Sequence, residues 1–285
     1  MFGNLYSQDS TRVADKFPEL TGPYLGQTPP GRIPQIFAPG IISTKENIEG
    51  SCTFSKEGNE FYFTKTEGHN PAGRTYIMVT KMTDSTWTEP VIAPFCGDET
   101  SFEPNIAPDG KKFYFNRFDM SDKDFKNGIW VMDRTDEGWS KPEFFIEGML
   151  LTATLNGNIY YTDIANPDRD IVCAEFVNGK YDSAKVVVGL DSEYLDAHPC
   201  IAPDESFMIF DSRRPDNNAP WELYVSFRND NGTWGKTYEL SRNFNEGYKM
   251  TASISPDGKY LFYYSNGNIY WVDASVIKKV VPKEK

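Results

Sequence analysis

A short turn phrase recurs along this chain at a nearly fixed interval, and it predicts the architecture. The phrase reads Ala-Pro-Asp-Gly at 107–110, Ala-Pro-Asp-Glu at 202–205 and Ser-Pro-Asp-Gly at 255–258, with a degenerate Ser-Lys-Glu-Gly copy at 55–58. Each copy precedes a short aromatic or apolar run, such as Phe113-Tyr114-Phe115. The interval from 107 to 202 is nearly double the others, and a worn copy at 155–161 fills it. Five copies, about 50 residues apart, indicate a repeat architecture.

The second repeat shows the expected plan of one unit. A short strand at 104–107 is followed by Asp109-Gly110, and Asp-Gly between apolar runs is a strong hairpin signal. The return strand is expected at 113–115, a third strand at 128–132 and a fourth near 143–146. Four-stranded antiparallel units in radial array are the blades of a propeller. The sequence therefore predicts an all-β, five-bladed β-propeller.

The fifth repeat lacks a fourth strand, and the N-terminal part of the chain supplies a candidate for it. No strand pattern follows Val272, whereas residues 33–40 resemble 89–94, the fourth-strand region of the first repeat. We expect this N-terminal strand to pair with the last blade and close the ring, which removes open sheet edges. The predicted organisation is an extended N-terminal segment at 1–32, the propeller at 33–277 and a basic C-terminal tail at 278–285.

The Ser/Ala-Pro-Asp-Gly hairpins resemble those of the TolB-like β-propeller family, over roughly residues 33 to 275. The resemblance implies a propeller. Its functional implication is broad, because the family includes partner-binding scaffolds, glycan-processing enzymes and proteins of no known activity. Residues 1–30 are polar and rich in Gly and Pro, like the spacer that follows a removed export signal. Together with the resemblance, this predicts a periplasmic or extracellular protein.

Composition and cysteine spacing exclude several classes of function. A net charge of -12 argues against nucleic acid or an anionic membrane as the main partner. No 18-residue apolar run is present, so no transmembrane segment is expected. The cysteines at 52, 96, 173 and 200 match no zinc pattern and are expected to be free thiols. We expect a monomer that uses no cofactor.

The sequence offers no convincing metal site. The acidic loops at 119–124 and 166–170 could hold calcium, but their spacing fits no EF-hand loop, and solvated loops are the simpler interpretation. The two histidines, His69 and His198, are too few for the His-rich metal site of oligogalacturonate lyases, whose repeats are related.

Aligned repeats place polar residues where the innermost strands begin, around the central channel. These residues are Ser51, Glu103, Thr152, His198 and Thr251. The second strands are expected to end at the same face, and their ends carry the charged residues Lys65, Arg117, Asp211 and Arg213. Arginine suits carboxylate or phosphate groups, so the pattern predicts a ring of cations at the channel mouth. The alternative is local pairing, of Arg117 with Glu103 and of Arg213 with Asp211.

The candidate ligand-binding residues are therefore Lys65, Glu103, Arg117, His198, Asp211 and Arg213. Glu103 and His198 are also the candidates for catalysis, because a carboxylate and an imidazole suit proton transfer near neutral pH. Glu103 and Asp211 are among several carboxylates that could serve glycoside hydrolysis, although no glycosidase motif is recognisable.

The leading functional hypothesis is an exported, non-catalytic binding protein that holds a small anionic or carbohydrate ligand, or an envelope protein partner, at the channel mouth. A glycan-active hydrolase or lyase with its site at the same mouth is the first alternative. A protein-interaction scaffold that uses its rim loops is the second, since a fold alone does not define a function.

Overall fold

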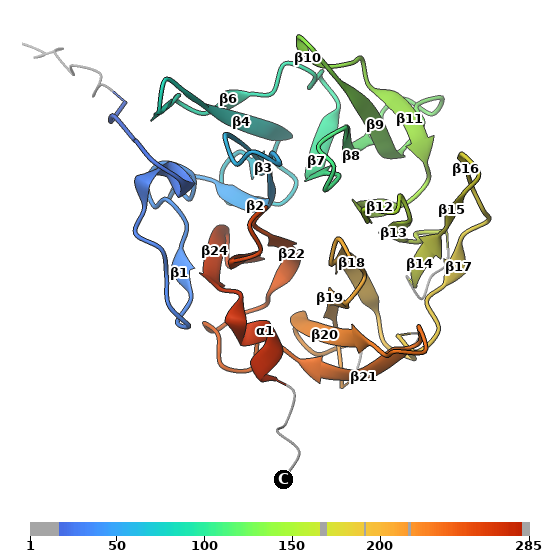
Figure 1. The fold of residues 1–285 in the computed structure, drawn as a ribbon. Helices are drawn as coiled ribbons and strands as arrows, with labels where there is room; N and C mark the ends of the chain where they lie inside the picture. Colours follow the sequence, from blue (N-terminus) through green and yellow to red (C-terminus); the bar gives the residue numbers. More distant parts are fainter. Residues whose placement is uncertain (1–16, 166–169, 191, 216–217, 281–285) are drawn as a thin grey trace, which may run out of the picture.

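Five antiparallel sheets stand around a central axis in the computed structural model (Figure 1), which describes residues 17–165, 170–190, 192–215 and 218–280. The five-bladed propeller is confirmed. Blade 1 contains β2 (Ile48–Phe54), β3 (Glu60–Thr66), β4 (Thr75–Thr83), β5 (Thr86–Trp87) and β6 (Val91–Ile92). Blade 2 contains β7 (Thr100–Ile106), β8 (Lys112–Phe118), β9 (Gly128–Thr135), β10 (Gly138–Trp139) and β11 (Glu143–Ile146).

The later blades follow the same order from the channel outward. Blade 3 contains β12 (Met149–Ala153), β13 (Ile159–Thr162), β14 (Ile171–Ala174) and β17 (Lys185–Val186), with a small hairpin of β15 (Phe176–Val177) and β16 (Lys180–Tyr181). Blade 4 contains β18 (Asp196–Ile201), β19 (Phe207–Ser212), β20 (Glu222–Arg228) and β21 (Trp234–Glu239). Blade 5 contains β22 (Met250–Ile254), β23 (Tyr260–Ser265) and β24 (Asn268–Asp273).

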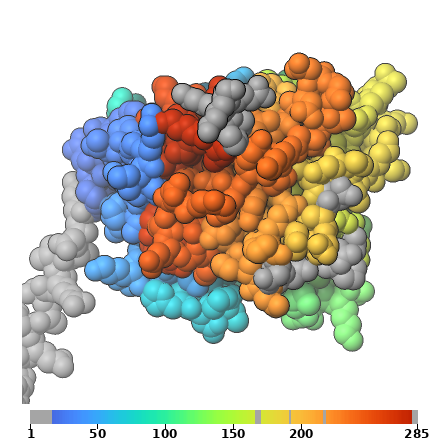
Figure 2. Space-filling model, turned by 90° about the horizontal axis from the view of Figure 1, so that it is seen from below, coloured from blue at the N-terminus to red at the C-terminus, as the bar shows by residue number. Residues whose placement is uncertain are grey.

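The fourth strand of blade 5 is β1 (Gln35–Ile36), which confirms closure of the ring by an N-terminal strand. Gln35 lies opposite Trp271, and the backbone N–H of Phe37 donates to the carbonyl of Ile269 at 2.8 Å. The N-terminal segment therefore lies directly against the C-terminal strands, as Figures 1 and 2 show.

Phe37 makes this junction a packed core as well as a strand pairing. Its side chain is fully buried, and its ring contacts Phe61, Phe262 and Trp271 at centroid distances of 5.1, 5.1 and 5.2 Å. Aromatic pairs at these distances contribute beyond their buried area. The contacts join β1 to blade 1 as well as to blade 5.

Residues 17–32 precede β1. The part around Leu20 and Gly22 packs against the outer edge of blade 1, whereas Tyr24 and Gly31 contact blade 5. The indole N–H of Trp87 donates to the carbonyl of Gly22 at 2.7 Å, and its backbone N–H donates to Leu20. The 3-10 turn η1 (Tyr24–Gly26) buries Leu25 beside these contacts. At the other end of the chain, α1 (Ser275–Lys279) follows β24, so Lys278 and Lys279 lie in a short helix.

The four cysteines are free thiols, and their chemistry gives a first prediction. Burial raises the pKa of both Cys52 and Cys200 to about 12. A thiol with so high a pKa holds little of the reactive thiolate. Cys52 and Cys200 should therefore resist a thiol reagent at pH 8 in the native protein, and all four should react after denaturation without reductant. A thiol count below four in the denatured protein would contradict this.

Candidate functional site

Every innermost strand carries a bulge at the same place, beside the central channel. The pairing register shifts between Gly50/Cys52, Phe102/Asn105, Met149/Thr152, Ala197/Cys200 and Met250/Ser253. A bulge inserts an extra residue and re-aims its side chain. In blades 2 to 5, the residue at this point has a positive φ: 55° at Glu103, 35° at Leu150, 52° at His198 and 50° at Thr251. This conformation is uncommon for residues other than glycine and marks the channel mouth as a specialised region.

The bulges correct the predicted alignment of blade 3. Its equivalent residue is Leu150, and Thr152 lies two positions further along β12. Thr152 pairs with Tyr160 and donates its hydroxyl hydrogen bond to the carbonyl of Pro199 at 3.0 Å. It therefore joins blade 3 to blade 4 inside the ring rather than facing the mouth.

Hydrogen bonds between neighbouring blades hold the bulges in place. At each of four junctions, the backbone N–H of the bulge residue donates to a second-strand side chain of the preceding blade. The donor and acceptor pairs are Glu103 to Thr64 (3.0 Å), Leu150 to Asn116 (3.0 Å), His198 to Thr162 (2.8 Å) and Thr251 to Asp211 (2.9 Å). At the fifth junction the equivalent residue is Tyr264, whose ring packs against Gly50. Strain at the bulges is thus offset by satisfied backbone donors.

Three buried charged side chains form a chain across the channel. Nδ1 of His198 lies 2.5 Å from a carboxylate oxygen of Asp211, and Nε2 lies 3.2 Å from a carboxylate oxygen of Glu103. The second Glu103 oxygen accepts the backbone N–H of Leu150 at 3.0 Å. An imidazole can donate from both nitrogens only when it is protonated. The geometry therefore fits an imidazolium between two carboxylates.

The electrostatics of the three groups agree with this assignment. Burial alone would lower the pKa of His198, but the charges and hydrogen bonds of Asp211 and Glu103 outweigh burial and raise it to about 10. Burial raises the pKa of Asp211 to about 6, against the opposing effect of His198. At pH 7 the imidazolium is thus protonated and Asp211 is ionised. The three groups are thus one imidazole and two carboxyl groups, which leaves no excess of cationic groups at this point.

A cavity of about 450 Å³ opens at the channel mouth, above the side chains of Glu103 and His198. Glu103 and His198 form part of its wall, together with the aromatic rings of Phe102, Trp221 and Tyr264. The remaining walls are hydroxyl and apolar side chains, among them Ser51, Thr64, Thr66, Thr75, Thr100, Thr251, Met149 and Met250. Its volume lies in the range of small-molecule sites.

Thr251 gives this cavity an unused hydrogen-bonding group. Its hydroxyl oxygen is buried and has no hydrogen-bond partner among the described residues, whereas Ser51 and Thr64 bond each other at 2.7 Å. Buried polar groups are nearly always paired, and an exception at a cavity wall is a natural contact for a ligand.

The structure brings three of the six predicted ligand-binding residues together, namely Glu103, His198 and Asp211. Asp211 lies behind His198, fully buried, and does not line the cavity. Lys65, Arg117 and Arg213 do not line it either, so the predicted ring of cations is not formed.

Strand alternation explains where the three cations lie. Thr64 and Thr66 line the mouth, so Lys65 between them faces the other side of the blade, beside Glu49. Arg117 pairs with Glu99 at 2.6 Å and stacks over Trp130, with 4.8 Å from its guanidinium carbon to the ring centroid. The guanidinium Nε of Arg213 donates to the carbonyl of Ala219 at 2.8 Å. Both arginines therefore have local partners, as the alternative interpretation expected. The partner of Arg117 is Glu99 instead of Glu103, and that of Arg213 is the carbonyl of Ala219 instead of Asp211.

Sequence reasoning missed the aromatic walls. Phe102 and Tyr264 each occupy a fixed repeat position next to the bulge, so the aligned repeats could have revealed them. Trp221 lies in the loop directly before β20, and no repeated sequence pattern predicts its position.

The structure also bears on the possible metal sites and on membrane-spanning helices. Among the described residues, no cluster of three or more His, Cys, Asp or Glu side chains could hold a metal ion. Asp119 instead accepts hydrogen bonds from the backbone and hydroxyl of Ser121, and residues 166–169 of the second acidic loop lie outside the described residues. The described part of the chain contains no helix with the length and apolarity needed to cross a membrane.

The comparisons with known proteins show the fold alone. No protein-family model and no curated protein matches the chain. An α-L-arabinofuranosidase from Podospora anserina is similar, with a TM-score of 0.52 and 10% identity over 88% of this chain and 95% of that one. The catalytic domain of a GH62 α-L-arabinofuranosidase from Coprinopsis cinerea has a TM-score of 0.52 and 11% identity over 86% and 97%. The TolB-like resemblance stays a prediction.

Proposed function

We propose that this protein is a non-catalytic binding protein whose channel mouth holds an uncharged saccharide. The observation that carries the proposal is the cavity wall, which combines the rings of Phe102, Trp221 and Tyr264 with hydroxyl groups. A sugar has apolar C–H faces that suit aromatic rings, and hydroxyls that suit a free donor and acceptor such as that of Thr251. We also propose that the protein is exported, to the periplasm or the extracellular space.

The charges at the mouth favour an uncharged ligand over an anion. Among the described residues, His198 is the one cation that lines this cavity, and the carboxyl groups of Glu103 and Asp211 flank it. An anionic ligand would therefore find no cation at this wall that is not already flanked by carboxyl groups, and it would lie close to the carboxyl group of Glu103.

The same geometry argues against glycoside hydrolysis. Most glycoside hydrolases use two carboxyl groups on either side of the scissile bond, with the sugar between them. Here the imidazolium of His198 occupies the space between Glu103 and Asp211, and Asp211 is completely buried. The similar structures are named as arabinofuranosidases, and one is in complex with cellotriose, which makes cellotriose a reasonable first probe.

Isothermal titration calorimetry with cellotriose and with gluconate tests the proposal. We expect saturable binding of cellotriose and much weaker binding of gluconate. Trp221→Ala should weaken cellotriose binding about tenfold, which corresponds to roughly 1.4 kcal/mol. Phe176→Ala, a change to an exposed ring on β15 outside the cavity, should leave the affinity unchanged.

Three results would count against the proposal. Tighter binding of gluconate than of cellotriose would favour an anion site. Unchanged affinity in Trp221→Ala would place the saccharide elsewhere. Hydrolysis of cellotriose or of an aryl arabinofuranoside that disappears in Glu103→Gln would establish the glycan-active alternative, because the amide cannot transfer a proton.

A further inference from the structure

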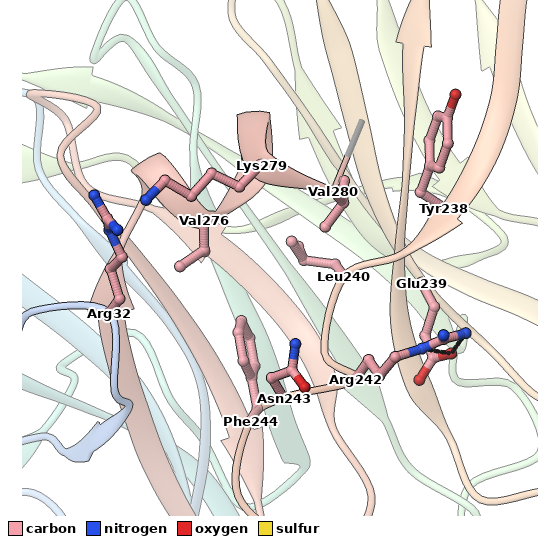
Figure 3. A pocket seen from close by; sticks show the side chains of 10 residues that line it. All are labelled: Arg32, Tyr238, Glu239, Leu240, Arg242, Asn243, Phe244, Val276, Lys279 and Val280. Atoms are coloured by element: carbon pink, nitrogen blue, oxygen red, sulfur yellow. Dashed lines mark hydrogen bonds and ion pairs between the residues drawn. The ribbon is translucent and has the colours of Figure 1, made fainter. Parts of the chain in front are cut away.

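A second cavity lies outside the channel, at the seam between blades 4 and 5 (Figure 3). Its volume is about 480 Å³, within the range of small-molecule sites. Three segments far apart in sequence build it: Arg32 before β1, the end of β21 with the loop that follows, and α1 with Val280. The cavity shares no lining residue with the channel mouth.

The floor of this seam cavity is apolar. Leu240 is buried, and Phe244, Val276 and Val280 are half-buried beside it. Figure 3 shows these four side chains between the charged groups at the two ends. Binding of a hydrocarbon chain to such an apolar surface is favourable, because it removes apolar area from water.

One end of the cavity is cationic. Figure 3 draws the head groups of Arg32 and Lys279 at this end, and neither forms an ion pair among the described residues. Hydrogen bonding by Ser275 first, and then the charges of Arg32 and Lys279, lower the pKa of Asp273. Two cations near one carboxylate leave one net positive charge. The whole protein has a net charge of -12, so a local excess of positive charge at this end of the cavity stands out from the rest of the molecule.

Among the residues that the structure describes, the opposite end carries no net charge. Arg242 pairs there with Glu239 at 3.0 Å, and Asn243 and Tyr238 are uncharged. The cavity therefore presents one positive end, an apolar middle and a neutral far end.

We propose that the seam cavity binds a monoanionic amphiphile, a medium-chain carboxylate in particular. The carboxylate would lie between Arg32 and Lys279, where charge-assisted hydrogen bonds are available. Its hydrocarbon chain would cover Val276, Leu240 and Phe244. A ligand in this position contacts the N-terminal segment, blade 4 and the C-terminal helix, so it stabilises the closed ring by mass action.

Sodium decanoate is the test probe, with decanol and decyltrimethylammonium as uncharged and cationic comparators of equal chain length. We expect calorimetry to give saturable one-to-one binding of decanoate, together with a rise in melting temperature. Decanol and the cation should bind at least tenfold more weakly. Arg32→Gln and Lys279→Gln should each weaken decanoate binding by about three- to tenfold, since each removes one exposed charge-assisted contact.

Matched variants separate this site from charge in general and from the channel mouth. Lys112→Gln, which removes an exposed lysine of blade 2, should not change decanoate affinity. Decanoate affinity should survive Trp221→Ala, whereas cellotriose affinity should survive Lys279→Gln, so the two proposals can fail separately. Absence of saturable decanoate binding, equal binding of decanol, or wild-type affinity in both Arg32→Gln and Lys279→Gln would overturn the inference.

Discussion

Replacing His198 by alanine is expected to destabilise the protein by about 3–5 kcal/mol, because it removes one partner of a buried charge network. The imidazolium supplies the countercharge between Asp211, which is fully buried, and Glu103, which is 6% exposed. Without it, two carboxylates face each other across the channel with no countercharge. Chemical denaturation in urea at pH 7 measures the loss, with the soluble fraction recorded in parallel.

The other histidine provides the matched control. His69 is exposed in the loop between β3 and β4, so His69→Ala should change the free energy of unfolding by no more than about 0.5 kcal/mol. A His198→Ala protein as stable as His69→Ala would contradict the buried charge network.

The pH dependence of stability checks the same group in the wild-type protein. The pKa of His198 is raised to about 10, so the folded state binds its proton more tightly than the unfolded state does. This contribution is fully present below about pH 6.5 and is lost as the pH rises through about 10. Melting temperature should therefore fall between pH 7 and pH 10, and His198→Gln should show a shallower fall. Equal slopes would exclude an imidazolium at this position.

Removing residues 1–42 should have an effect of at least similar size, because it opens the ring. The deletion removes β1, the buried Phe37 and Ile42, and the contacts of Leu20 and Gly22 with Trp87. It also leaves β24 as an unpaired edge, which invites association between molecules. We expect aggregation on expression, or a large fall in melting temperature, measured by light scattering and calorimetry.

Point variants keep this prediction testable if the deleted protein is insoluble. Phe37→Ala should cost about 3–5 kcal/mol, since it empties a site enclosed by four aromatic rings. Ile33→Ala is the control, because Ile33 is 80% exposed. A truncated protein that remains monomeric and as stable as the wild type would contradict closure by the N-terminal strand.

The fold could be predicted from sequence because each blade repeats its own local signals. The Asp-Gly turns, the aromatic runs after them and the match of residues 33–40 to 89–94 are all visible in short stretches of sequence. The structure has the expected order of strands and the expected closing pair. Several strands are longer than predicted, since β7 begins at Thr100 and not at 104. Even the worn copy at 155–161 forms the turn between β12 and β13 and the beginning of β13.

The site could be predicted only in part, because its geometry depends on bulges and on strand alternation. A bulge adds one residue without changing the local pattern, so Thr152 was placed where Leu150 lies. A side chain one position away along a strand faces the opposite side, which removes Lys65 from the mouth that Thr64 and Thr66 line. Glu103 and His198 could be predicted because each is the polar residue at the point where the innermost strand of its repeat begins.

A crystal structure of the protein soaked with cellotriose and gluconate together tests the central claim most directly. We predict density for the sugar at the channel mouth, against Trp221 and within hydrogen-bond distance of the Thr251 hydroxyl, with His198 still between Glu103 and Asp211. Gluconate bound at the mouth in place of the sugar, or a mouth without ligand while the sugar occupies another surface, would contradict the account.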